Sequence, residues 1–280
     1  MKCLRLLIAV LGSLAAPVHA APHSNVYALL SAVGSRFEVI HTRQQTGSHL
    51  EAADRAAYRV EGNVLNRLVL QGLDRAVARL DPGSRRVYLS MEPNWSGRYR
   101  KLSDKLPASV LDELRKMDRS GWDRLLVAVP AQRVEDKDGL GRRLQGMGLY
   151  VQTQCQSDTG WGGRIGSCEN SFRPASGPEA HTPKGETTAA NTFIAPYTFI
   201  EVWVMDPRTL EVIDRTIQHG HRKLSDDSGN VKGILSGFHD EFLATQIVEV
   251  VQHAAREAVE DAGLRGKVQV QDRGPVPAAR

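Results

Sequence analysis

The sequence contains very little cysteine: three residues in 280, and one of them, Cys3, lies at the extreme N-terminus. A structural zinc site uses four ligands, so Cys155 and Cys168 cannot form one by themselves. Their Cys-x12-Cys spacing also differs from the Cys-x-x-Cys of thioredoxin-like redox sites. The cysteine pattern therefore argues against both zinc binding and thiol redox chemistry.

Common catalytic and cofactor motifs are also missing. The sequence has no Gly-x-Ser-x-Gly nucleophile elbow, no His-Glu-x-x-His zinc motif and no EF-hand loop. The glycine cluster Gly160–Gly166 has neither the dinucleotide-binding spacing nor the Lys-Ser/Thr of a phosphate loop. The sequence leans towards a protein that is not an enzyme and that holds no cofactor.

Long apolar runs are absent except at the N-terminus. Residues 1–20 begin with Lys2 and Arg5, continue with the apolar stretch Leu6–Ala16 and end at Ala20, with small residues at positions −3 and −1. This is the pattern of a cleaved secretory signal peptide, and its apolar stretch is shorter than the ~20 residues that span a bilayer. We predict cleavage after Ala20, export, and no transmembrane segment in the mature chain.

A large excess of charge of one sign is absent too. The formal net charge is +4, and loss of the signal peptide would remove two of these positive charges. So small an excess, together with export, argues against nucleic acid as a partner. Arginine greatly outnumbers lysine, which is typical of a GC-rich bacterial genome, and the predicted location is therefore the periplasm.

Hydrophobic periodicity predicts a single α/β domain over residues 21–265, followed by a flexible tail at 266–280. Val26–Ala32 and Arg36–Thr42 read as two strands, which we expect to form a hairpin that turns at Gly34. The Ala-rich segment 50–60 favours a short helix. It would lead into a longer helix at 61–80, where apolar residues recur at helical spacing.

The remainder of the domain adds further strands and helices. Tyr197–Met205 and Leu210–Gln218 flank Asp206–Thr209, a strong turn signal that predicts a second hairpin. These elements predict a mixed sheet of about six or seven strands with two hairpins, packed by about three helices. The other expected strands and helices are Arg86–Met91, Leu125–Val129, Gly148–Thr153, Pro107–Met117 and Phe238–Ala262.

The order of these elements, with the Asp206–Thr209 turn ahead of a late helix, resembles the α/β domains of envelope accessory lipoproteins. The resemblance implies a fold of that kind and a place in the cell envelope. It carries over no site residue.

The segment 155–191 interrupts the regular pattern, because Gly, Ser, Thr and Pro dominate it. Loops of this length within a domain are usually functional or disordered. In an oxidising compartment Cys155 and Cys168 are expected to form a disulfide, worth about 3 kcal/mol, that closes the loop. Trp161 and Arg164 would then be presented to a sugar, peptide or protein. The alternative is that Trp161 packs over the disulfide as a small core.

A second candidate contact is the basic and aromatic stretch Asn94–Lys101. Trp95, Arg98 and Tyr99 combine stacking surface with positive charge, which suits an anionic polysaccharide or an acidic protein surface. Because the stretch follows a predicted strand, it would lie at one end of the sheet, where open α/β folds often place their sites. The alternative is a solvated loop with Trp95 packed at its base.

The histidines provide a third candidate. His219 and His221 are two residues apart at the end of a predicted strand, so both side chains can point to one face. His239 and Asp240 begin the last helix, and together with the pair they could hold zinc or another transition metal. The alternative gives Asp240 a capping role, since acidic residues stabilise the first turn of a helix.

These features favour an exported periplasmic binding or accessory protein of the bacterial cell envelope. It would not be catalytic, and it would present the disulfide-closed loop to an envelope protein or a cell-wall polysaccharide. Two alternatives stay open. One is a metal-dependent periplasmic hydrolase that uses His219 and His221. The other is a structural subunit of an envelope assembly that makes contact through the turn at Asp206–Thr209.

Overall fold

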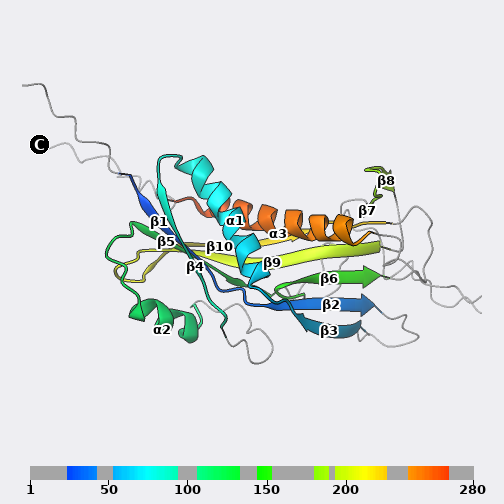
Figure 1. Ribbon diagram of the computed structural model, residues 1–280, viewed down its shortest axis with the longest axis horizontal. Helices are drawn as coiled ribbons and strands as arrows, with labels where there is room; N and C mark the ends of the chain where they lie inside the picture. The colour runs from blue at the N-terminus through cyan, green and yellow to red at the C-terminus, as the bar shows by residue number, and fades with distance from the viewer. Residues whose placement is uncertain are drawn as a thin grey trace, which may run out of the picture.

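The computed structural model describes residues 24–42, 53–93, 106–132, 144–152, 180–188, 193–225 and 239–264. These residues form a main sheet of eight strands and three helices, with a separate pair of two-residue strands (Figure 1). The prediction of one mixed α/β architecture with three helices is confirmed. The strand count is one higher than the upper end of the predicted range.

The helices are α1 (Val64–Leu80), α2 (Ala108–Lys116) and α3 (Asp240–Ala262). The strands of the main sheet are β1 (Val26–Ser31), β2 (Arg36–Thr42), β3 (Ala53–Arg59), β4 (Arg85–Ser90), β5 (Arg124–Pro130), β6 (Met147–Gln152), β9 (Phe193–Met205) and β10 (Val212–His221). The small pair consists of β7 (Ala180–His181) and β8 (Thr187–Thr188), within the segment predicted to be a long loop. No described helix has both the length and the apolar composition needed to cross a bilayer.

The long strand β9 holds the sheet together. Its first half, Phe193–Thr198, pairs with β6, and its second half, Ile200–Met205, pairs with β5 along the same edge. β10 pairs with the other edge of β9, so the sheet order is β3-β2-β6-β9-β5-β1-β4 with β10 attached to β9. The predicted hairpin around Asp206–Thr209 is therefore confirmed.

The predicted hairpin at Gly34 is wrong. β1 pairs in parallel with β4 and β5, whereas β2 pairs with β3 and β6. Leu29 and Leu30 of β1 have no exposed surface, and a strand buried on both faces is stabilised best between two neighbours in the sheet interior. The chain between β1 and β2 therefore crosses from one part of the sheet to another instead of folding back.

The prediction of a helix at residues 50–60 is also wrong, because Ala53–Arg59 forms β3. β3 pairs with β2 over its full length, from Arg36 opposite Arg59 to Thr42 opposite Ala53. The helix propensity of alanine is weak compared with a complete antiparallel ladder on an otherwise unpaired edge. This strand accounts for the higher strand count.

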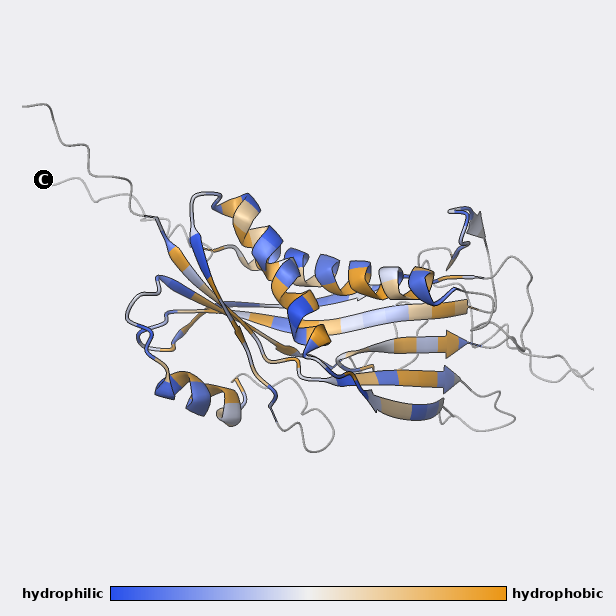
Figure 2. Cartoon of the chain, viewed as in Figure 1, coloured by the Kyte–Doolittle hydropathy of each residue, from blue (hydrophilic) through white to orange (hydrophobic). Residues whose placement is uncertain are grey.

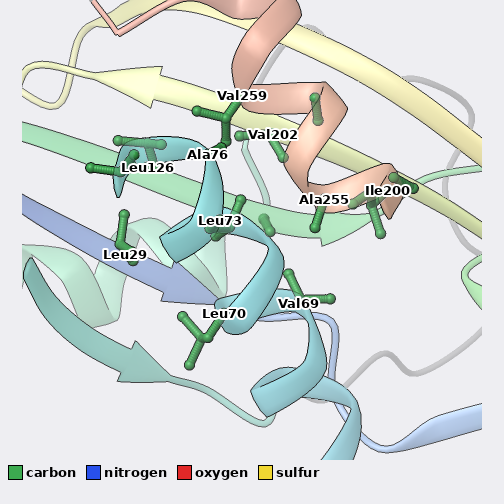
Figure 3. Packing of buried hydrophobic residues seen from close by; sticks show 14 of the residues in the cluster. Leu29, Val69, Leu70, Leu73, Ala76, Leu126, Ile200, Val202, Ala255 and Val259 are labelled. Carbon is green, nitrogen blue, oxygen red and sulfur yellow. The ribbon is translucent and has the colours of Figure 1, made fainter. Parts of the chain in front are cut away.

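Helices α1 and α3 cover one face of the sheet and α2 covers part of the other (Figure 1). Leu73 and Ala76 of α1 lie among side chains from β1, β5, β9 and α3, as Figure 3 shows. Helices α1 and α3 carry hydrophilic as well as hydrophobic residues along their length (Figure 2), as expected for amphipathic helices that bury one side. The predicted stripe of α3 is confirmed at Val251, Ala254, Ala255 and Ala258, while Phe242 and Ile247 are only partly buried.

Small residues let α1 and α3 approach each other closely. A Cβ atom placed on Gly72 of α1 would lie 2.5 Å from the carbonyl oxygen of Gln252 and 2.6 Å from the Cβ of Ala255. Only glycine fits at this crossing, because the nearest atom belongs to the backbone and cannot rotate away.

A buried asparagine connects α1 to the strand ends. The Oδ1 of Asn66 accepts hydrogen bonds from the Ser31 hydroxyl at 2.8 Å and from the Val33 backbone N–H at 3.1 Å. Its Nδ2 donates to the Asn63 side chain at 2.6 Å and to the Met91 carbonyl at 3.2 Å. Asn66 therefore fixes the chain where it leaves β1 and β4.

Candidate functional site

A groove of about 600 Å³ lies where β10 meets α3. Its described lining comes from four places in the sequence: Arg75 of α1, His181 of β7, residues 219–223 at the end of β10, and the segment of α3 from Glu249 to Glu257. Most of these side chains are charged or can become charged, and only Val250 is aliphatic. This composition suits a polar ligand more than an apolar one.

Gly220 sets the separation between β10 and α3. A Cβ atom at this position would lie 3.2 Å from both the Ala254 Cβ and the Val250 carbonyl oxygen. Glycine in the middle of a strand often marks such a close approach. The residue thus places the charged end of β10 directly beside α3.

The flanking histidines point the other way. Side chains alternate along a strand, so His219 and His221 lie on the face opposite Gly220. The His219 ring stacks on the Phe199 ring of β9, with centroids 6.0 Å apart. The prediction that the two histidines share a face is consistent with this geometry. Both residues border the groove, but the His219 ring packs on the sheet face away from α3.

Arginines tie the groove lining together. Arg75 donates from Nη1 to the Gln252 side-chain oxygen at 2.6 Å, which links α1 to α3. Arg222, just beyond β10, donates from Nη1 to the Gln246 oxygen at 2.8 Å and to Glu249 at 2.7 Å. These contacts hold guanidinium groups from two separate segments against α3.

The metal hypothesis receives no support from the described residues. Within them, no group of three or more His, Cys, Asp or Glu side chains is arranged to hold a metal ion. His219 and His221 lie in β10, whereas His239 is the residue that precedes α3 and Asp240 is the first residue of that helix. Asp240 and Glu241 occupy the acidic first turn, as the capping alternative requires.

Several predicted site residues lie outside the described part of the chain. They are the loop residues Cys155, Trp161, Arg164 and Cys168 and the basic aromatic residues Trp95, Arg98 and Tyr99. The structure therefore lends no support to the disulfide-closed loop, and the binding roles of these residues stay predictions. The same holds for the signal peptide at 1–20 and the tail at 266–280.

The turn of the β9–β10 hairpin is stabilised by its own aspartate. The Oδ1 of Asp206 accepts hydrogen bonds from the backbone N–H groups of Arg208 at 2.7 Å and Thr209 at 3.1 Å. The hydrogen bond from the Thr209 N–H, followed in size by the one from the Arg208 N–H, lowers the pKa of Asp206 from its usual 3.8, because both bonds favour the charged carboxylate. A second hollow of about 500 Å³, lined in part by Trp122 and Arg124, lies next to this turn.

Sequence reasoning found two of the groove residues, His219 and His221, and missed the rest. The missed groups include Arg75, His181 and Arg256, which are distant in the sequence and come together only through tertiary packing. One signal was available: a glycine between the two histidines of a strand indicates that another backbone lies close.

Comparisons with known proteins assign no family. No protein-family model matches the chain, and no curated protein matches it. Solved structures match only weakly. A Xanthomonas campestris protein described by the family model DUF330 has 9% identity and a TM-score of 0.32, and the match covers 85% of this chain and 86% of that one.

Two further solved structures match to a similar degree. A neuraminyllactose-binding hemagglutinin homologue of Helicobacter pylori has 7% identity and a TM-score of 0.33, with 85% of this chain and 80% of that one covered. The hypothetical protein CT253 of Chlamydia trachomatis has 12% identity and a TM-score of 0.30, with 85% and 95% covered. Likenesses this weak transfer no function to the chain.

Proposed function

We propose that the chain is an exported, non-catalytic binding or accessory protein of the bacterial cell envelope. The groove between β10 and α3 carries this proposal. Its volume of about 600 Å³ falls within the ~300–1,000 Å³ usual for ligand sites. Its charged residues come from α1, β7, β10 and α3, and they line a hollow instead of filling the core.

The cellular context rests on the N-terminal sequence. A basic start, a short apolar stretch and a cleavage signal at Ala20 are the features of an exported protein. The partner classes that fit are an envelope protein and a cell-wall polysaccharide. The segment from Cys155 to Cys168 would add a second contact surface through Trp161 and Arg164.

Site-specific photo-crosslinking in intact bacteria tests the binding role. A photoreactive residue at His253, whose side chain is 55% exposed in the groove, should yield a defined adduct that mass spectrometry can identify. The matched control is Tyr88 on the β4 edge, which is 53% exposed and lies outside the groove. Equal labelling at both positions, or none at His253, would contradict a binding role for the groove.

Cell fractionation and N-terminal sequencing test the location. The mature chain should begin at Ala21 and be released with the periplasmic fraction. Recovery of an uncleaved chain from the cytoplasm would refute the envelope assignment.

The loop surface needs its own test. Trp161→Ala should leave thermal stability nearly unchanged while it reduces partner capture. Loss of stability in this variant would instead assign Trp161 to a small core and remove the loop from the proposed binding surface.

A further inference from the structure

We propose that the groove between β10 and α3 binds the phosphate groups of an anionic ligand. This inference rests on the proposed binding function and specifies the ligand chemistry. The described lining holds three arginines, Arg75, Arg222 and Arg256, against two carboxylates, Glu249 and Glu257. Lys223 also borders the groove, with its Nζ 5.1 Å from the centre of the Phe193 ring. The groove therefore has a surplus of positive charge at any histidine protonation state.

The two carboxylates of the lining already have partners. Glu249 accepts a hydrogen bond from Arg222 at 2.7 Å, and an oxygen of Glu257 lies 3.2 Å from His253 Nδ1. Arg75 is bonded to a neutral group, the amide oxygen of Gln252. Its positive charge consequently has no carboxylate of the lining to neutralise it.

Arg256 is only weakly compensated. Its Nε lies 3.8 Å from a Glu260 oxygen, which is too long for a hydrogen bond. Glu260 also forms an ion pair with Arg79 of α1, so one carboxylate serves two arginines. The surplus charge of the groove is therefore centred on α1 and the middle of α3.

Phosphate is the chemistry that this arrangement favours. A guanidinium group presents a planar fork of N–H donors that matches two oxygens of a phosphate group. Arg75, Arg222 and Arg256 belong to three different segments, so a ligand that contacts them together needs several anionic oxygens. A phosphate group supplies at least two such oxygens, whereas a neutral sugar would leave the charge surplus uncompensated.

Calorimetric titration of the purified chain with inorganic pyrophosphate tests this site. Arg75→Gln and Arg256→Gln should each weaken binding about tenfold or more, the usual loss for a hydrogen bond to a charged group. Arg67→Gln is the matched control, an exposed arginine of the same helix about two turns before Arg75 and outside the groove lining. Arg115→Gln on α2 is a second control, on the opposite side of the sheet. Both controls should bind like the wild type.

Removal of negative charge should have the opposite effect. Glu249→Gln and Glu257→Gln should tighten pyrophosphate binding several-fold, while Glu113→Gln on α2 should not. A gain of binding cannot result from misfolding. The Glu249→Gln and Glu257→Gln variants therefore keep the proposal testable even if an arginine variant is unstable.

Vesicle flotation separates the two sources of phosphate. One set of vesicles consists of neutral phosphatidylcholine, and the other also contains about 20% of the anionic lipid phosphatidylglycerol. Binding of the chain to each set is compared with its binding to pyrophosphate. Binding to pyrophosphate alone identifies a soluble phosphorylated ligand, and binding to anionic vesicles that Arg75→Gln abolishes identifies a lipid headgroup. Either result supports phosphate recognition.

Two outcomes would overturn the inference. One is the absence of binding to both probes, and the other is an equal loss in Arg75→Gln and Arg67→Gln, which would indicate unspecific charge attraction. If the His253 photo-adduct persists in either case, the groove binds a partner of other chemistry and only the phosphate inference fails. If the adduct is also absent, the proposed function fails with it.

Discussion

The two sides of α3 differ sharply in composition. The side that meets α1 and the sheet consists of Val251, Ala254, Ala255, Ala258 and other small apolar residues, nearly all without exposed surface. The groove side carries the ionisable residues Glu249, His253, Arg256 and Glu257 within two turns or so. One helix thus separates the residues that pack in the core from those that line the groove.

This separation has a physical cause. The inner side of α3 requires small side chains because it lies in close contact with Gly72 of α1 and Gly220 of β10. The outer side is free of that constraint, so charged groups there contribute little to folding. Substitutions on the two sides should therefore have effects of very different size.

The largest effect is expected at Leu73, which is fully buried between α1, α3 and the sheet. Leu73→Ala should lower the free energy of unfolding by about 2–5 kcal/mol, since it removes buried methyl groups and leaves a cavity. Urea denaturation measures this loss. The control is Leu80→Ala in the same helix, where the side chain is 44% exposed, and it should change stability far less.

The next effect is expected at the helix crossing. Gly72→Ala should destabilise the chain by about 1–3 kcal/mol, because the new Cβ would meet the Gln252 carbonyl oxygen at 2.5 Å. Thermal unfolding can be compared with that of Gly83→Ala, where a Cβ would have no neighbour within 4 Å. Equal behaviour of the two variants would show that α1 and α3 can separate at no cost.

A smaller effect is expected where β10 meets α3. Gly220→Ala should cost about 1 kcal/mol, less than Gly72→Ala, because its closest contacts are 3.2 Å and require only a slight shift. The same shift would move α3 away from Arg222. The free energy of pyrophosphate binding should therefore fall by more than the free energy of unfolding. Both free energies can be measured on one sample. A larger loss of stability in Gly220→Ala than in Gly72→Ala would contradict the expected ranking.

The smallest effect on stability is expected on the groove side itself. Glu257→Gln should change the free energy of unfolding by less than about 0.5 kcal/mol, since the carboxylate is 43% exposed and its ion-pair partner among the described residues is His253. Chemical denaturation would detect a larger change. Such a change would mean that the two sides of α3 are not energetically distinct.

The sequence predicted local structure well and long-range pairing poorly. The β9–β10 hairpin was predictable because Asp206 bonds the backbone of its own turn at Arg208 and Thr209. The supposed hairpin at Gly34 failed because β1 and β2 each find better partners far away, such as β5 at Leu125–Ala128. Periodicity identifies a strand, but it does not name the neighbour of that strand.

The candidate site shows the same limit. His219 and His221 share a strand, so their proximity could be inferred from their spacing. Arg75 and Arg256 are far apart in the sequence and meet the strand only because α1 crosses α3 at Gly72. No local pattern encodes that crossing.

The position of β9 in the sheet also determines when the fold can be completed. β4, β1 and β5 form one ladder and β3, β2 and β6 form another, and β9 is the only described strand that pairs with both. All strands of these two ladders precede β9 in the chain, between Val26 and Gln152. During synthesis the inner edges of the two ladders therefore stay unpaired until residues 193–205 have been made. Protection of those edges by a chaperone would matter most in that interval.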